Sequence, residues 1–191
     1  LNTTISAGGV FRAIHIHSGA TVFLKNLRLQ DGIEQDGIGG GGILNEGSFL
    51  SIQNVIINNN VSERRGGGIA NYSAYLSVQD SELYLNESAD GNASDSNLEC
   101  GGAIYHEGNG TVVVARTLFD ENIAKWGGGG ICQFGGELVV RDSDFYRNDS
   151  TGDSLSDTAG GAIYTHDGTN SITTVVRSLF EENSSKSGGA I

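Results

Sequence analysis

The sequence predicts an all-β fold, a right-handed single-stranded parallel β-helix (solenoid) of about 6–7 coils, each of 26–35 residues. Three observations predict it: a glycine-rich tetrapeptide that recurs along the chain, apolar residues that alternate with a period of two, and the absence of any proline. Proline would remove a hydrogen-bond donor from a sheet, so a proline-free chain is compatible with strands that pair throughout.

The recurring tetrapeptide is Gly-Gly-Ala-Ile or its variant with a third glycine. It occupies 40–43, 66–69, 101–104, 128–131, 160–163 and 188–191, at intervals of 26, 35, 27, 32 and 28 residues. Isoleucine is the fourth residue of every copy. The paired glycines predict a sharp turn in which no Cβ fits, and the intervals indicate the length of one coil.

A second landmark is an apolar residue followed three positions later by asparagine. The pairs are Ile57 and Asn60, Leu83 and Asn86, Phe119 and Asn122, Phe145 and Asn148, and Phe180 and Asn183. Apolar residues also stand five and seven positions before most of these anchors, and this alternation is typical of a β-strand. We therefore expect an irregular N-terminal coil over residues 1–21 and β-helix repeats over residues 22–191. The last repeat stops after Ile191, which favours continuation of the chain or end-to-end self-association into a filament.

Composition excludes several classes of function. Lys and Arg total 11 against 23 Asp and Glu, a formal net charge of −12. Because phosphate binding requires clustered cations, we expect no nucleic-acid partner. No apolar stretch approaches the roughly 20 residues of a membrane-spanning helix, so we expect no membrane insertion of this segment.

The alternation of Gly-Gly-Ala-Ile with Phe-x-x-Asn resembles the repeats of the chlamydial polymorphic outer-membrane proteins and related β-helical surface proteins. The best copies lie at 119–131 and 180–191, and the resemblance covers roughly residues 22–191. It implies a secreted, adhesive passenger domain, although the membrane barrel of such a protein does not occur in this sequence.

Asparagine has two competing interpretations. Eight of the 16 asparagines begin an Asn-x-Ser/Thr sequon, which predicts glycosylation at Asn92, Asn109, Asn71, Asn2, Asn60, Asn86, Asn148 and Asn183. Glycans require exposed asparagines. However, a buried asparagine ladder is predicted at Asn60, Asn86, Asn122, Asn148 and Asn183, where each side-chain amide would bind neighbouring coils.

A column of charged residues stands three positions before the apolar anchors. Asp80, Arg116, Asp142 and Arg177 alternate in sign at one-coil spacing, which predicts an ionic ladder. A catalytic arginine, as in pectin-cleaving β-helices, is the alternative, but an opposite charge stands beside each arginine.

Metal binding has weak support. His15 and His17 would lie on one face of a strand and could ligate a metal, but no carboxylate or cysteine accompanies them at metal spacing, so a solvated pair is favoured. Two acidic insertions could hold calcium, one with Asp90, Asp95 and Glu99 and the other with Asp149, Asp153 and Asp157. Their spacing matches no calcium loop, and we expect no cofactor.

Two further residue types leave alternatives open. Cys100 and Cys132 lie about one repeat apart and are either unpaired or joined by a disulfide. Trp126 packs a corner or stacks on a sugar.

Taken together, these features predict a non-enzymatic extracellular or cell-surface scaffold, structural or adhesive, with a host or glycan surface as a ligand. The alternative is a carbohydrate-active enzyme, a polysaccharide lyase or hydrolase, which would need a base or paired carboxylates clustered on one face.

Overall fold

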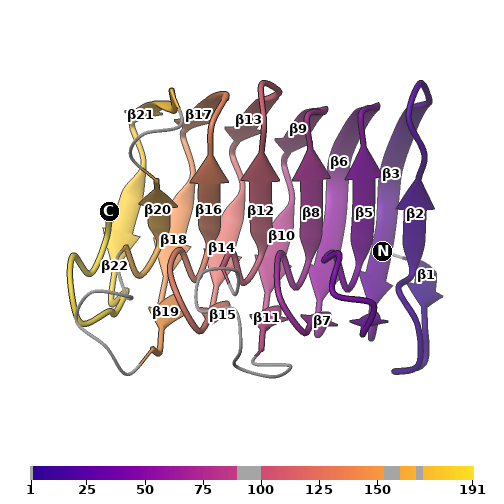
Figure 1. Cartoon of the computed structure of the whole chain (residues 1–191), viewed down its shortest axis with the longest axis horizontal. Helices are drawn as coiled ribbons and strands as arrows, with labels where there is room; N and C mark the ends of the chain where they lie inside the picture. The colour runs from indigo at the N-terminus through magenta and orange to yellow at the C-terminus, as the bar shows by residue number, and fades with distance from the viewer. Residues whose placement is uncertain (1, 90–99, 153–159, 167–169) are drawn as a thin grey trace.

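A computed structural model describes residues 2–89, 100–152, 160–166 and 170–191 (Figure 1). These residues form parallel strands and turns, and none of them lies in a helix. Accordingly, no helix able to cross a bilayer occurs among them. The all-β class with parallel, repeating strands is thus confirmed.

The strands form three sheets. The large sheet has 11 strands, β1 (Thr3–Ser6), β3 (Thr21–Gln30), β6 (Phe49–Asn58), β9 (Tyr75–Gln79), β10 (Glu82–Tyr84), β13 (Thr111–Ala115), β14 (Leu118–Asp120), β17 (Glu137–Arg141), β18 (Asp144–Tyr146), β21 (Ile172–Val176) and β22 (Leu179–Glu181). The front sheet has six, β2 (Ile14–Ile16), β5 (Ile43–Glu46), β8 (Ile69–Tyr72), β12 (Ile104–Glu107), β16 (Ile131–Phe134) and β20 (Ile163–Thr165). The short-strand sheet has five, β4 (Ile33–Glu34), β7 (Val61–Ser62), β11 (Glu87–Ser88), β15 (Ile123–Ala124) and β19 (Asp149–Ser150).

Each strand pairs with the equivalent strand one repeat away. In Figure 1 the front sheet faces the viewer, the large sheet lies behind it, and the short strands follow the lower edge. Ile69, Ile104 and Ile131 are register partners and fully buried, as their shared motif position predicts. The apolar anchors pair in the same manner, and the rings of Phe119, Phe145 and Phe180 stack with centroids 4.5 and 4.8 Å apart. The core is therefore a set of parallel rows of like residues.

The N-terminal segment is more regular than the sequence suggested. Residues 1–21, predicted as an irregular coil, contain β1 and β2. Ile5 pairs with Leu29 and Ile14 with Ile43, so both isoleucines occupy the inward columns. This segment lacks the Gly-Gly-Ala-Ile landmark, although its strand positions keep the apolar residues.

The glycine pair has two separate roles. At Gly128 the backbone has φ +59°, and an added Cβ would lie 2.0 Å from the carbonyl oxygen of Ile131. Gly129 has no positive φ, but its Cβ would lie 2.5 Å from the backbone nitrogen of Asp149 in the next repeat. The first glycine therefore permits the turn, and the second permits close contact between repeats.

Two further bends in each repeat use residues other than glycine. The charged column and its equivalents have φ between 48° and 57°, at Asn26, Asn54, Asp80, Arg116, Asp142 and Arg177. The residues just before the ladder positions have φ between 47° and 57°, at Asp31, Asn59, Leu85, Glu121, Arg147 and Glu182. A left-handed residue costs roughly 1–2 kcal/mol for an L-amino acid. Each bend is thus made by one left-handed residue. Six of the twelve are Asn or Asp, which adopt this conformation readily, and the strain falls on the others, such as Leu85 and Arg116.

Candidate functional site

The five ladder asparagines form one continuous row. Each side-chain nitrogen donates to the side-chain oxygen of the next asparagine along the row, at 2.9 Å from Asn60, 3.0 Å from Asn86, 2.9 Å from Asn122 and 2.9 Å from Asn148. Asn60, Asn86, Asn122 and Asn148 are fully buried, and Asn183 is half-buried. The row therefore holds neighbouring repeats in register.

Burial excludes glycans from several predicted positions in the folded protein. The Asn60, Asn86 and Asn148 side chains belong to the ladder, and Asn71 is fully buried on β8. Those four glycosylation candidates are wrong, because a buried amide that bonds within the protein has no room for a sugar. Asn2 and Asn109 are exposed and stay candidates, whereas Asn92 lies outside the described residues.

The excess of sequons has a structural cause. Two positions after Asn60, Asn86 and Asn148, the side chains of Ser62, Ser88 and Ser150 point inward on the short strands and are at most 3% exposed. These inward positions favour small residues, as Ala124 on β15 shows in the ladder copy without a sequon. At these three positions the Asn-x-Ser pattern therefore follows from the packing of the repeat and is no argument for glycosylation.

The charged column forms two ion pairs. Nε of Arg116 lies 2.6 Å from Oδ1 of Asp80, and Nε of Arg177 lies 2.6 Å from Oδ1 of Asp142. Hydrogen bonds from the two arginines lower the pKa of Asp80 and of Asp142. Both pairs are exposed and contribute little to stability. The predicted ladder is thus a succession of strand-to-strand pairs at the left-handed bends.

A groove of about 410 Å³ follows these bends between the two halves of the large sheet. Asp80, Glu82, Arg116, Asp142 and Asp144 are among its lining residues. Because the arginines keep Asp80 and Asp142 ionised, neither carboxyl group is suited to donate a proton near neutral pH.

An exposed aromatic strip lies on the outer face of the large sheet. We define it as Phe23 on β3, Phe49 on β6 and Tyr75 on β9, which are 61%, 38% and 37% exposed. The Phe49 and Tyr75 rings are stacked with centroids 4.8 Å apart, and those of Phe23 and Phe49 are 5.8 Å apart. The Phe49 and Tyr75 rings lie 3° from parallel and give this face a flat apolar surface, which the Phe23 ring, tilted by 54° to Phe49, extends at an angle.

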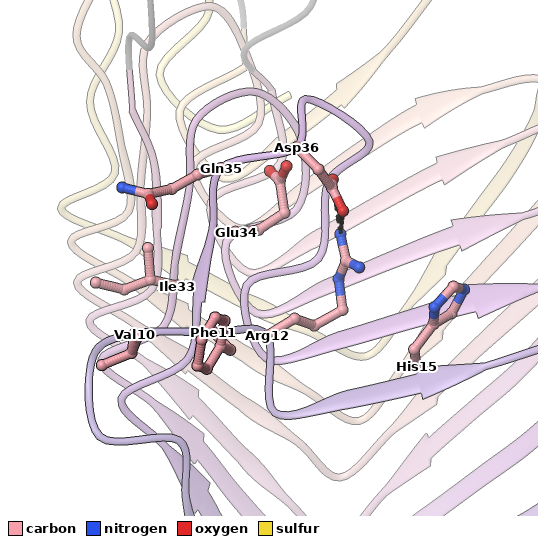
Figure 2. Close-up of a pocket in the computed structure, with 8 residues that line it drawn as sticks. All are labelled: Val10, Phe11, Arg12, His15, Ile33, Glu34, Gln35 and Asp36. Atoms are coloured by element: carbon pink, nitrogen blue, oxygen red, sulfur yellow. Dashed lines mark hydrogen bonds and ion pairs between the residues drawn. The ribbon is translucent and has the colours of Figure 1, made fainter.

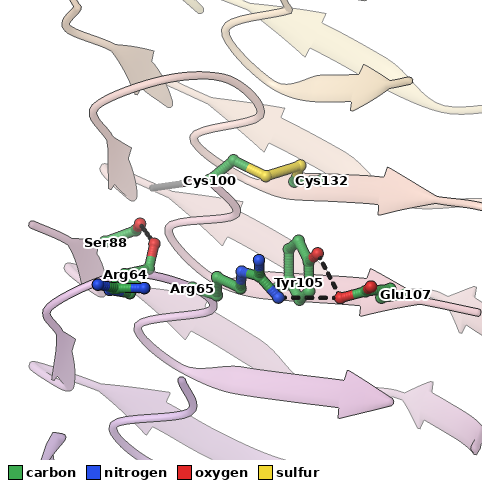
Figure 3. The surroundings of a disulfide bond; sticks show 7 residues. All are labelled: Arg64, Arg65, Ser88, Cys100, Tyr105, Glu107 and Cys132. Atoms are coloured by element: carbon green, nitrogen blue, oxygen red, sulfur yellow. Dashed lines mark hydrogen bonds and ion pairs between the residues drawn. A yellow bond between two sulfur atoms is a disulfide. The ribbon is translucent and has the colours of Figure 1, made fainter. Parts of the chain in front are cut away.

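The two cysteines form a disulfide on the outer side of the front sheet (Figure 3). Cys132 on β16 is the register partner of Tyr105, so the bond connects adjacent repeats. Both cysteines are fully buried in a cluster with Tyr105, against which Trp126 packs. Trp126 meets the ring of Tyr164 edge-on at 6.3 Å, which is the corner-packing alternative rather than an open sugar platform.

Beside the disulfide lies a charged aromatic group. Arg65 is 5.1 Å from the centroid of the Tyr105 ring and 2.9 Å from a carboxylate oxygen of Glu107. The Tyr105 hydroxyl donates to the same oxygen at 2.8 Å (Figure 3). Burial raises the pKa of Tyr105, so the hydroxyl stays protonated as a donor.

At the N-terminal end a pocket of about 450 Å³ is lined by residues that include Phe11, Arg12, His15, Glu34 and Asp36 (Figure 2). Arg12 pairs with Asp36 at 3.0 Å. Burial raises the pKa of Glu34. Although burial opposes the change, hydrogen bonds with Glu34 and Arg12 lower the pKa of Asp36 to about 2. Of the two neighbouring carboxyl groups, Glu34 therefore holds a proton more readily than Asp36, as a general acid does beside a general base.

An inward polar column on the front sheet was missed by sequence reasoning. Asn45 donates to Asn71 at 2.7 Å, and the Asn71 amide nitrogen lies 3.0 Å from Nδ1 of His106. Gln133 follows His106 in register, and both are fully buried. The signal was a polar residue two positions after the motif isoleucine in each of the first five copies.

The metal candidates from the sequence are the carboxylates of the two insertions and the histidine pair. Of the insertion carboxylates considered for calcium, only Asp149 on β19 is described, and Asp90, Asp95, Glu99, Asp153 and Asp157 lie outside the described residues. His15 and His17 lie on β2 or at its end, and β5 brings Glu46 beside them.

Comparison with protein-family models, curated proteins and solved structures finds no match to this chain.

Proposed function

We propose that this chain is a non-enzymatic extracellular scaffold, with the outer face of its large sheet presented to a glycan or another cell-surface ligand. The exposed strip of Phe23, Phe49 and Tyr75 is the observation that supports this proposal most directly. Flat aromatic faces stack on the apolar faces of sugar rings, and exposed apolar surface on a rigid sheet is typical of interaction sites. The proposal agrees with the adhesive role that the resemblance to chlamydial surface repeats implies.

We further propose that the three sheets are the faces of a right-handed parallel β-helix. Two features support it: the five successive repeats from β3 to β20 each contribute strands to all three sheets, and register partners in every sheet lie one repeat apart. Such a solenoid keeps equivalent side chains in straight outward rows. A ligand with a repeating structure could then contact several repeats at once.

An extracellular location is supported by the disulfide. Bonds such as Cys100–Cys132 persist in oxidising compartments and are rare in reducing ones. The exposed Asn2 and Asn109 are the described positions open to N-glycosylation. Intact mass of the natural protein before and after glycosidase treatment tests for sugars at these sites.

The test of the adhesive proposal is binding of the folded chain to an array of polysaccharides and cell-surface glycans. We expect Tyr75→Ala and Phe49→Ala to weaken binding several-fold, because each removes one ring of the strip. Leu179→Ala is the matched control, since Leu179 is 45% exposed on β22, outside the strip. Equal binding by all variants contradicts the role of the strip, and no glycan binding by the wild type excludes a glycan as its ligand.

A second candidate function, carbohydrate-active catalysis, is favoured by the N-terminal pocket. Glu34 and Asp36 are paired carboxyl groups whose pKa values lie apart, the arrangement that glycosidic cleavage uses. A polysaccharide turnover screen decides between the candidates. Turnover that is abolished by Glu34→Gln but retained by Glu87→Gln would establish catalysis in the N-terminal pocket. Loss of turnover in Arg116→Ala would instead assign the reaction to the groove at the charged column.

A further inference from the structure

Two histidines and a carboxylate meet on the outer side of the front sheet, although they belong to different repeats. His15 lies on β2 and His17 directly follows it, so strand alternation directs both rings to one side. Glu46 ends β5, the parallel neighbour of β2. Their spacing in the sequence, 31 and 29 residues from Glu46, conceals this group until β2 and β5 are paired.

The donor atoms of the group lie close together. Nε2 of His15 is 2.7 Å from Oε2 of Glu46, and Nδ1 of His17 is 3.9 Å from the same oxygen. One ligand atom from each residue lies within 4.8 Å of the others, and the imidazole centroids are 4.0 Å apart. Tetrahedral Zn²⁺ with bonds of about 2.0–2.1 Å separates its ligand atoms by roughly 3.4 Å. Small side-chain rotations therefore suffice to place all three atoms around one ion.

We propose that His15, His17 and Glu46 form a binding site for a divalent transition metal of the zinc class. Two imidazole nitrogens and one carboxylate oxygen suit Zn²⁺, Ni²⁺, Co²⁺ or Cu²⁺, whereas Ca²⁺ and Mg²⁺ prefer sites made of oxygen ligands. Three protein ligands leave one tetrahedral position for water or for a ligand from solution.

The surrounding charges are compatible with a cation. Arg12 is the nearest described cation in sequence, and its guanidinium donates to Asp36 and to the carbonyl oxygens of Gly39 and Gly40. Glu46 has no cationic partner other than the two histidines among the described residues. The His15 ring also lines the N-terminal pocket, so the open metal position would lie at its rim.

A bound ion would have a mechanical effect as well. It would join β2 to β5 outside the sheet, in addition to the backbone pairing of Ile14 with Ile43 and of Ile16 with Asn45. The metal would therefore fasten the N-terminal strand to the following repeat.

The experiment is isothermal titration of the metal-free 191-residue chain with Zn²⁺. We expect one ion per chain and a loss of affinity on the order of 10- to 100-fold or more in His17→Ala and in Glu46→Gln. His17 is suited to the test because its side chain is 79% exposed, so its removal leaves the core intact. His166→Ala controls for the loss of a histidine outside the group.

Two measurements keep the result interpretable. Thermal unfolding of each metal-free variant verifies folding, and the visible spectrum of bound Co²⁺ reports whether the ion is four-coordinate. A Co²⁺ spectrum that is lost in His17→Ala but kept in His166→Ala supports the site. Equal Zn²⁺ affinity in wild type and His17→Ala, or preference for Ca²⁺ over Zn²⁺, overturns the proposal and leaves only ion pairs between the histidines and Glu46.

Discussion

A single ladder asparagine contacts the repeats on both sides of its own. The side-chain nitrogen of Asn122 donates to the carbonyl oxygen of Leu83 at 2.8 Å and to Asn148 at 2.9 Å. Its side-chain oxygen accepts from the backbone and side-chain nitrogens of Asn86 at 3.1 and 3.0 Å. All four hydrogen-bonding positions of the amide are thus occupied without water.

Replacement of Asn122 by alanine is expected to lower the free energy of unfolding by about 2–4 kcal/mol, because it leaves several buried polar groups without partners. Denaturant unfolding measures the change. Since Asn122 is not in a sequon, loss of a glycan cannot produce it. Asn109→Ala, at an exposed asparagine, should change stability by no more than about 0.5 kcal/mol, and equal effects of the two variants would contradict the ladder's role.

The sequence could predict the ladder positions but could not choose between ladder and glycan. Asn60 and Asn86 satisfy both patterns, because the serine two positions later fits a sequon as well as an inward site on a short strand. The choice depends on burial, which follows from pairing with repeats up to 36 residues away. For the same reason the sequence could not predict that Glu46 lies beside His15 and His17, because these two histidines belong to another repeat.

At the scale of one element, the polar column inside the front sheet contains a buried histidine. His106 on β12 lies between Asn71 and Gln133 in register and is fully buried. Burial lowers the pKa of its imidazole, which is therefore neutral in the folded protein under conditions where an exposed histidine begins to protonate.

This histidine predicts acid sensitivity. Below about pH 6.5 the unfolded chain protonates His106 while the folded chain does not, so the unfolded state binds more protons. The free energy of unfolding should fall as the pH falls, by at most about 1.4 kcal/mol per pH unit from this residue. His106→Gln should remove that part of the slope in denaturant unfolding from pH 7 to 5. Parallel pH profiles for the two proteins would show that His106 does not contribute.

The disulfide joins Cys132 on β16 to Cys100, which lies shortly before β12, the strand with which β16 already pairs. Cys100 and Cys132 are 32 residues apart, and closing a loop of this length stabilises a fold by about 2–4 kcal/mol. Reduction should therefore lower the melting temperature of the wild type. The Cys100→Ala/Cys132→Ala variant should melt at a lower temperature and not respond to reductant, and a response in that variant would assign the effect to something other than this bond.

At the scale of the whole molecule, stabilising contacts connect neighbouring repeats. Hydrogen bonds, stacked rings and the disulfide each join a repeat to the next one along the row. The motif spacing was sufficient to predict these rows, because every copy keeps the same inward positions. It could not predict the left-handed bends at residues such as Leu85 and Arg116, since those side chains have no preference for positive φ.

Nearest-neighbour contacts predict how core substitutions combine. Phe119 and Phe145 stack with their rings 3° from parallel, so a double-mutant cycle with leucine at both should give a coupling of about 0.5–1.5 kcal/mol. Ile57 and Phe145 stand at the same column with two repeats between them. A cycle between Ile57→Val and Phe145→Leu should be additive within about 0.5 kcal/mol. Strong coupling across that distance would contradict a chain of local contacts.

In any secretory pathway that attaches N-glycans, folding of the repeats competes with glycosylation of the buried sequons. Before the chain folds, Asn60, Asn86 and Asn148 are accessible acceptors, and once the ladder closes they are inaccessible. A sugar added early would hold its asparagine outside the row and leave the amides on either side without partners. Correct folding there would require the repeats to pair before the oligosaccharyltransferase modifies these asparagines. A glycan at any of the three would identify molecules that were modified before the ladder formed.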